Sequence, residues 1–473
     1  MASDSKTEVL YTDPNRTRMV PPPGQGERTL ISSDGYGAAP GAKALTITAL
    51  ADNDYVSNGV VSKSHILFEI RSTGGLVHPS LQTGMDIGHG TRLPLNIALV
   101  IDRSGSMDGE PLEYAKRACG YVVDLLEPND ILSVITFEET AEVIMPARRV
   151  VNKPLVKEYI NRIYAGNTTN LSEGLMQGCM QVASVKSENS LNRVLLLTDG
   201  EPTAGIKDFS SIVSQVSEQK ARGITVTALG FGPDYNEELL AGIARRSGGN
   251  YYHVSRPDLI PEVFRREMDT LMRITARNLR LRIQAQRGVQ MKKVYGQQPT
   301  FGSRAVEIIL PDVERDSAIS SLWQFEMSPR PEGNFRTMKA ELLYDDASTG
   351  RCERLVAEVV QTFTSDNELI AANANKRVQS EVEVAEATRA LDRTIMTART
   401  QQMDRTLIMA ELERTKTLMM DRGMGSQARE ITLAMTEIQS GASVEKTLMG
   451  AVYQLDQGKT HLEQGGGAAG GSK

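Results

Sequence analysis

Short apolar runs alternate with amphipathic stretches along residues 93–275, and this alternation is the most regular pattern in the chain. Near-continuous apolar runs such as LNIALVI (95–101) and RVLLLTD (193–199) predict strands that are buried on both faces. Between such runs, segments such as EPLEYAKRACGYVVDLL (110–126) place apolar residues at helical spacing. Strands that alternate with helices in this way are typical of a doubly wound, mostly parallel sheet, so we expect an α/β domain over residues 93–275.

The segments on both sides of this domain show period-two alternation instead. Residues 44–92 contain ALTITAL and SHILFEIRS, and residues 276–364 contain RNLRLRIQAQ and RLVAEVVQTF. These runs predict short strands, and no long helical pattern separates those of the second segment, which is typical of an antiparallel β unit. We expect the strands of residues 44–92 to join this unit, so that the α/β domain is an insertion within a β-sandwich.

The C-terminal part of the chain changes character once more. Residues 365–463 are rich in Ala, Glu, Arg, Met and Leu, which favour helices. Gly423 and Gly425 interrupt the pattern, and two shorter helices are expected around residues 426–440 and 442–463. This composition predicts an antiparallel bundle or hairpin. Residues 1–43 are expected to form a flexible arm and residues 464–473 a disordered tail.

Composition excludes several classes of protein. The 473 residues carry a formal net charge of −6, which argues against general binding of nucleic acid. No apolar run approaches the roughly 18 residues of a membrane span, and the first residues lack the pattern of a signal peptide. Cys119, Cys179 and Cys352 are too scattered for a disulfide framework or a zinc site. We therefore expect a cytoplasmic protein.

Candidate chemistry appears where the first apolar strand of the α/β domain ends. Asp102, Ser104 and Ser106 form a D-x-S-x-S turn there, and all three offer the hard oxygen ligands that Mg²⁺ or Mn²⁺ prefers. Thr169 and Asp199 follow other segments that would end on the same edge of the sheet. Five oxygen-bearing side chains from three loops could therefore converge on one divalent cation.

This set of residues resembles the metal-ion-dependent adhesion site of a von Willebrand factor A domain. Asp102, Ser104 and Ser106 match the first part of the pattern, Thr169 its later threonine, and Asp199 its second aspartate. Thr168 precedes Thr169, but the TNL context favours Thr169. The flanking β segments and helical tail are similar in layout to bacterial cytoplasmic proteins of this family and to inter-alpha-trypsin inhibitor heavy chains. The resemblance implies a cation with an open position that an acidic side chain of a partner fills.

The leading hypothesis is a non-enzymatic module that binds a protein partner through Mg²⁺ or Mn²⁺. The partner would offer a Glu or Asp to the metal, and an AAA-type ATPase and further copies of the chain are candidates. The alternative is a self-assembling scaffold in which the metal site latches neighbouring subunits. A metal-assisted hydrolase is disfavoured, because the chain shows no H-E-x-x-H, Walker or G-x-S-x-G pattern and no general base beside the site.

Overall fold

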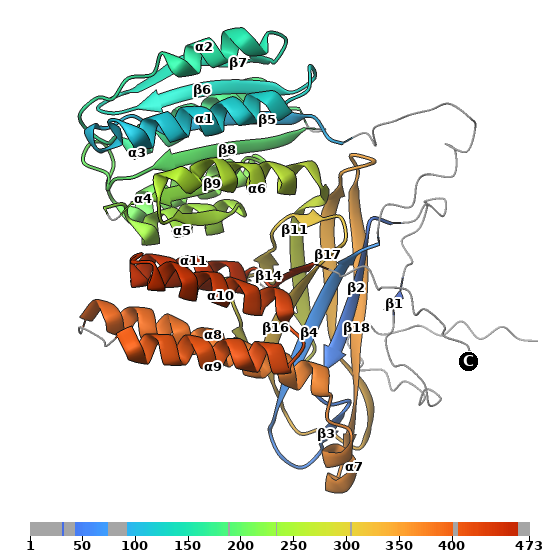
Figure 1. The fold of residues 1–473 in the computed structure, drawn as a ribbon. Helices are drawn as coiled ribbons and strands as arrows, with labels where there is room; N and C mark the ends of the chain where they lie inside the picture. Colours follow the sequence, from blue (N-terminus) through green and yellow to red (C-terminus); the bar gives the residue numbers. More distant parts are fainter. Residues whose placement is uncertain are drawn as a thin grey trace, which may run out of the picture.

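Figure 1 shows the computed structural model of the chain, in which an α/β head, a β unit of two sheets and a helical region pack together. The structure describes residues 31–32, 43–73, 92–187, 190–232, 234–302, 305–400 and 405–461. The predicted arm (1–43) and tail (464–473) lie outside the described residues, apart from Ile31–Ser32 and Lys43. No helix among the described residues is long and apolar enough to cross a membrane.

The head is a six-stranded sheet in the order β10-β9-β8-β5-β6-β7, parallel except for the edge strand β7. Its strands are β5 (Leu95–Asp102), β6 (Ile131–Phe137), β7 (Ala141–Arg149), β8 (Leu191–Thr198), β9 (Thr225–Phe231) and β10 (Tyr251–Val254). Its helices are α1 (Glu110–Leu125), α2 (Lys153–Asn161), α3 (Leu171–Ser184), α4 (Phe209–Ala221), α5 (Glu237–Ser247) and α6 (Ile260–Met272). Helices α1, α2 and α6 cover one face and α3, α4 and α5 the other, which buries β5 and β8 completely.

The β unit is built from strands on both sides of the head in the sequence. One sheet has the order β1-β18-β17-β11-β14-β13, and the other has the order β12-β16-β4-β2. The strands before the head are β1 (Ile31–Ser32), β2 (Leu45–Ala51), β3 (Tyr55–Ser57) and β4 (Ser62–Ser72). Those after it are β11 (Ile274–Ala285), β12 (Val289–Val294), β13 (Thr300–Phe301), β14 (Val306–Ile309), β15 (Val313–Glu314), β16 (Ser317–Met327), β17 (Gly333–Asp346) and β18 (Cys352–Thr364). The head is therefore an insertion within an antiparallel β unit, as predicted.

The helical region follows β18 and packs below the head and beside the β unit (Figure 1). Its helices are α7 (Asn367–Ala372), α8 (Lys376–Thr400), α9 (Arg405–Asp421), α10 (Gly425–Gln439) and α11 (Val444–Asp456). Together with the head and the β unit, they confirm the fold class predicted from the sequence. The prediction that the last helix continues to residue 463 is wrong for Lys459–His461, which form a strand, β19, paired with β16. Gly458 ends the helix with a φ of +63°, and a Cβ there would lie 2.2 Å from the carbonyl oxygen of Ser320.

Polar contacts join the head to its neighbours. Arg193 of β8 forms a buried ion pair with Asp312 of the β unit at 3.0 Å.

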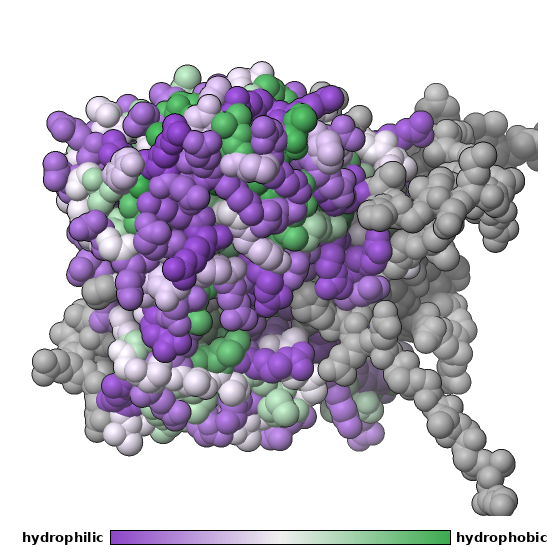
Figure 2. Space-filling model, turned by 45° about the horizontal axis from the view of Figure 1, so that its top comes forward, coloured by the Kyte–Doolittle hydropathy of each residue, from purple (hydrophilic) through white to green (hydrophobic). Residues whose placement is uncertain are grey.

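In Figure 2, hydrophilic residues dominate the visible face of the molecule, and hydrophobic residues occur there as small, separate patches. That face therefore offers no broad apolar surface for docking.

His253 of β10 is half-buried where Gly450 of α11 lies against it, and the charges of Lys446 of α11 and Glu237 of α5 act on it. Its Nδ1 is 2.7 Å from the hydroxyl of Tyr235, and burial lowers the pKa of His253 from 6.5 to about 4, with the charge of Lys446 adding to this effect. Between pH 6.5 and 4 the unfolded chain therefore binds a proton that the folded chain does not. The free energy of unfolding thus decreases as the pH is lowered through this range.

We expect the wild type to lose about 2 kcal/mol of stability relative to His253→Asn as the pH falls from 7 to 4. Urea unfolding of both proteins across this range measures the difference, because contributions from other titrating groups cancel in the comparison. Parallel stability curves for the two proteins would contradict the prediction.

Candidate metal centre

The candidate site lies at the carboxyl ends of the parallel strands in the head. Strands β5 and β8 are neighbours in register, with Ile101 opposite Leu197, so Asp102 and Thr198 end their strands side by side. The turn after β5 carries Ser104 and Ser106, and the turn after β8 carries Asp199. Loops that leave the same edge of a parallel sheet form its usual ligand site.

Asp102 is fully buried, with 0% of its surface exposed. One carboxylate oxygen accepts a hydrogen bond from the backbone N–H of Ser104 at 2.8 Å, and the other accepts one from the hydroxyl of Thr198 at 2.5 Å. Burial raises the pKa of Asp102 to about 6, and the nearby charge of Asp199 raises it further, against the effect of these hydrogen bonds. Asp102 is thus a rigidly held carboxylate in an environment that penalises its negative charge.

The two serines connect Asp102 to the second carboxylate. The hydroxyl oxygens of Ser104 and Ser106 are 3.1 Å apart, and Ser106 donates a hydrogen bond to Asp199 at 2.8 Å. Asp199 is buried, which raises its pKa, while the hydroxyl of Ser106 acts in the opposite direction. Both carboxylates and both serine hydroxyls therefore gather in one small volume.

Thr169 reaches the same volume from the loop before α3. Its backbone N–H donates to the hydroxyl of Thr203 at 2.8 Å, and its carbonyl accepts from the N–H of Thr203 at 2.9 Å. A Cβ built on Gly200 would lie 3.4 Å from the hydroxyl oxygen of Thr169 and 4.0 Å from that of Ser106. These positions bring Thr169 to the other four residues, and Gly200 leaves the space between them open.

The residues present fit a divalent cation. Two carboxylates and three hydroxyls surround the site, and in the part of the chain that the structure describes no lysine or arginine forms an ion pair with Asp102 or Asp199. Buried carboxylates without a positive partner are costly, and a cation between them removes that cost. All five side chains offer oxygen, which suits Mg²⁺ or Mn²⁺.

Several residues that support the site were not singled out from the sequence. Thr198 orients Asp102, Thr203 anchors the loop of Thr169, and Glu138 accepts a hydrogen bond from the N–H of Asn167 at 3.0 Å. Glu138 is also held by Arg103 at 2.6 Å. Thr198 directly precedes Asp199 in the sequence, so its position at the strand end was a usable signal, whereas the contacts of Glu138 depend on the tertiary fold.

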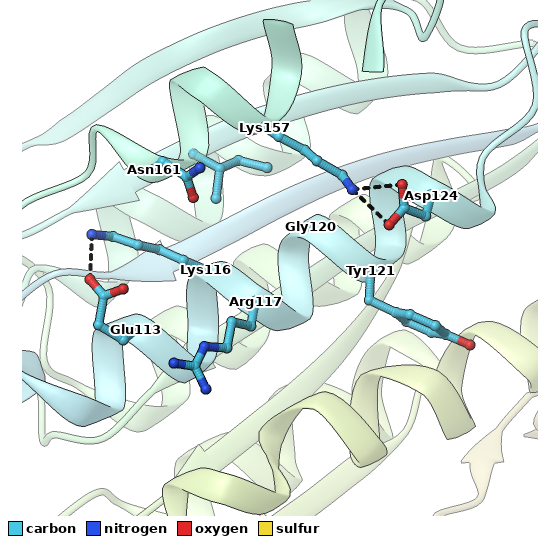
Figure 3. Close-up of a pocket in the computed structure, with 9 residues that line it drawn as sticks. Glu113, Lys116, Arg117, Gly120, Tyr121, Asp124, Lys157 and Asn161 are labelled. Atoms are coloured by element: carbon cyan, nitrogen blue, oxygen red, sulfur yellow. Dashed lines mark hydrogen bonds and ion pairs between the residues drawn. The ribbon is translucent and has the colours of Figure 1, made fainter. Parts of the chain in front are cut away.

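Figure 3 shows a second concave region, between α1 and α2, with a cavity volume of about 310 Å³. Two ion pairs line it, Lys116 with Glu113 at 2.9 Å and Lys157 with Asp124 at 2.7 Å, and Arg117 lies over the ring of Tyr114. This groove is lined by residues of α1 and α2 and by none of the five residues at the strand ends. It offers no set of converging, unpaired ligand groups comparable to that around Asp102.

Comparison with known proteins identifies the head. The profile of the von Willebrand factor type A domain matches residues 96–266. An uncharacterized protein of Synechocystis sp. is 35% identical over 193 residues, which cover 41% of this chain and 45% of that protein. Human inter-alpha-trypsin inhibitor heavy chain H4 is 26% identical over 248 residues, which cover 47% of this chain and 26% of the heavy chain. The chain thus spans less than half the length of these relatives.

Solved structures resemble the chain well beyond the head. A von Willebrand factor type A protein from Catenulispora acidiphila superimposes with a TM-score of 0.68 at 17% identity, covering 90% of this chain and 100% of that one. The ArnB paralog VWA2 from Sulfolobus acidocaldarius superimposes with a TM-score of 0.59 at 16% identity, covering 89% of this chain and 100% of the paralog. At these identities the likeness concerns the fold, and it includes the β unit and helices as well as the head.

Proposed function

Because residues 96–266 form a von Willebrand factor type A domain, we propose that the chain is a non-enzymatic, metal-dependent protein-binding module. Asp102, Ser104, Ser106, Thr169 and Asp199 hold one Mg²⁺ or Mn²⁺ in this proposal, and the cation binds a Glu or Asp of a partner protein. The observation that carries it is the pair of buried carboxylates, which meet three hydroxyls and no described basic side chain.

The charge balance of the site supports binding of a further carboxylate. Two carboxylates neutralise a divalent cation only approximately, and the hydroxyls of serine and threonine add no charge. A cation that needs about six oxygen ligands keeps room for one from outside after these side chains are counted. An acidic side chain of a partner supplies both the missing oxygen and a favourable charge.

Thr169→Val is expected to weaken binding of Mn²⁺ by the full-length chain about tenfold or more, because it removes one hydroxyl and retains the shape of the side chain. Calorimetric titration of the metal-free protein with Mn²⁺ measures the affinity. Ser210→Ala is the matched control, since its hydroxyl donates a hydrogen bond to Asp208 at the start of α4, which is not one of the five proposed ligands. Equal affinity of Thr169→Val and the wild type would remove Thr169 from the ligand set.

Capture of a partner tests the second half of the proposal. Bait protein with Asp102→Ala, and wild-type bait in EDTA, should both lose the protein that the wild type retains in Mg²⁺. Retention in all conditions would reject a role for the metal. If the captured protein is another copy of the chain, light scattering should show assemblies of the wild type in Mg²⁺ that are lost without Mg²⁺. That result would favour a self-assembling scaffold.

A further inference from the structure

Glu138 is the first residue after strand β6, which is the neighbour of β5 in the sheet of the head. Asp102 lies opposite Phe137 in the register of these two parallel strands. The chain after β6 therefore leaves the sheet at the same edge as the residues of the metal centre. Strand β6 itself carries none of the five proposed ligands, and the side chain of Glu138 beyond it is 22% exposed.

The carboxylate of Glu138 joins two loops that carry proposed ligands. One oxygen accepts a hydrogen bond from the side chain of Arg103, which lies within the D-x-S-x-S turn, at 2.6 Å. The other oxygen accepts a hydrogen bond from the backbone N–H of Asn167, two residues before Thr169, at 3.0 Å. Both oxygens of this carboxylate are thus used to link the turn after β5 to the loop of Thr169.

The backbone of Glu138 holds the same loop at a second point. Its carbonyl accepts from the N–H of Asn170 at 2.6 Å, so Glu138 binds the loop on both sides of Thr169. The N–H of Gly166 in turn donates to the carbonyl of Arg103 at 2.5 Å. A Cβ built on Gly166 would lie only 1.8 Å from a carboxylate oxygen of Glu138, so a side chain at position 166 would exclude this arrangement.

We propose that Glu138 is a positioning residue for the metal centre, which holds the loop of Thr169 against the D-x-S-x-S turn so that the hydroxyls of both reach one cation. This inference rests on the proposed function, because it assumes that the five residues at the strand ends hold a metal. Glu138 is not a ligand in this proposal and acts through Thr169. A loop released from Glu138 opens more often, and each open state lacks one ligand.

The negative charge of Glu138 offers a competing explanation for any effect of this residue on the cation. Positioning and charge differ in one respect that can be measured. An effect that acts through the hydroxyl of Thr169 disappears when that hydroxyl is absent, whereas an effect of charge through space persists. A change at Gly166 also disturbs the contact between Glu138 and the loop while every charge is retained.

Glu138→Gln in the full-length chain is expected to weaken Mn²⁺ binding roughly tenfold, the lower end of the losses expected when a group that orients a metal ligand is removed. The amide keeps the size of the side chain, but its nitrogen cannot accept a hydrogen bond, so the link to either Arg103 or Asn167 is lost. Calorimetric titration of the metal-free protein with Mn²⁺ measures the affinity, and urea unfolding measures the stability of each variant.

Asp130→Asn is the matched control, because Asp130 directly precedes β6 at the opposite end of the same strand. Its carboxylate is likewise held by an arginine and by the backbone, since it accepts from Arg92 at 3.0 Å and from the N–H of Leu95 at 2.8 Å. Asp130→Asn should reduce the free energy of unfolding and leave the affinity for Mn²⁺ unchanged. A role of Glu138 in folding alone would give the same result for Glu138→Gln, which would overturn the proposal.

A double-mutant cycle tests whether Glu138 acts through Thr169. The chain with both Glu138→Gln and Thr169→Val should bind Mn²⁺ no more weakly than Thr169→Val alone. Losses that multiply would overturn the proposal. A wild type that binds no Mn²⁺ at all would instead overturn the proposed metal centre.

Gly166→Ala provides a second variant that does not alter charge, and it decides the matter if Glu138→Gln fails to fold. Its methyl group displaces the carboxylate of Glu138 from the loop, so Mn²⁺ binding should again weaken in the wild-type background and not in the Thr169→Val background. Wild-type affinity of Gly166→Ala for Mn²⁺ would overturn the proposal.

Discussion

Replacement of Asp102 by Asn is expected to abolish measurable binding of Mn²⁺ while raising the stability of the metal-free protein. The amide keeps the shape of the side chain and can still accept from the N–H of Ser104 and contact the hydroxyl of Thr198. It removes a fully buried negative charge that no described basic side chain neutralises. We expect the free energy of unfolding in EDTA to rise by about 1–3 kcal/mol.

Opposite effects on metal binding and stability distinguish a ligand from a residue that only supports the fold. Urea unfolding in EDTA and in Mn²⁺, with calorimetric titration of the metal, measures both quantities. Asp208→Asn is a suitable control, because Asp208 caps the start of α4 and its loss should slightly reduce stability without changing Mn²⁺ affinity. Binding of Mn²⁺ by Asp102→Asn with the affinity of the wild type would contradict the prediction.

Replacement of Asp312 by Leu is expected to cost about 3–5 kcal/mol of stability, because it leaves buried positive charge without a partner. Asp312 pairs with Arg193 at 3.0 Å, with both side chains less than a tenth exposed. The ammonium of Lys220 has no hydrogen-bond partner among the described residues, and burial lowers its pKa, an effect that the charge of Asp312 opposes. Removing Asp312 therefore leaves Arg193 without its partner and also removes the negative charge that offsets the burial of Lys220.

The companion variants make the electrostatic explanation testable. Arg193→Met should reduce stability less than Asp312→Leu, because Asp312 still offsets the charge of Lys220. The double variant should reduce stability by less than the sum of the two single variants. Urea unfolding followed by fluorescence of Trp323, which is buried in the β unit, measures these differences. The more exposed pair of Arg336 and Glu358 is the control, and Arg336→Met should change stability by less than about 1 kcal/mol. Equal losses of stability in the two single variants would argue against an electrostatic role for Lys220 at this contact.

The sequence was most informative where local pattern and position in the fold coincide. The alternation of apolar runs with helical segments predicted the parallel sheet, and the structure adds that β5 and β8 are neighbours in it. The expected common edge of the sheet, together with the resemblance to the metal-ion-dependent adhesion site, allowed Asp102 and Asp199 to be grouped before the structure was known. Thr169 was added to them from the position of its loop at the same edge, and the TNL context of the family pattern favoured it over Thr168.

Contacts between distant segments could not be predicted in the same way. Lys459–His461 continue a helical composition, and only pairing with β16 and the turn at Gly458 make them a strand. Lys446 has the pattern of a solvent-facing lysine in a helix, and its burial depends on the carbonyl of Tyr235, 211 residues earlier in the chain. In both cases tertiary contacts outweigh local propensity.

The strand β19 has a mechanical consequence for the helical region. The region leaves the β unit at β18 and rejoins it at β19, so it is tethered to the β unit at both ends. If α11 separates from the head, it stays within a short distance of its binding surface, and the two meet again at a high effective concentration. Undocking would therefore be a rapidly reversible equilibrium within one molecule, governed by the ratio of closing to opening rates rather than by the concentration of the protein.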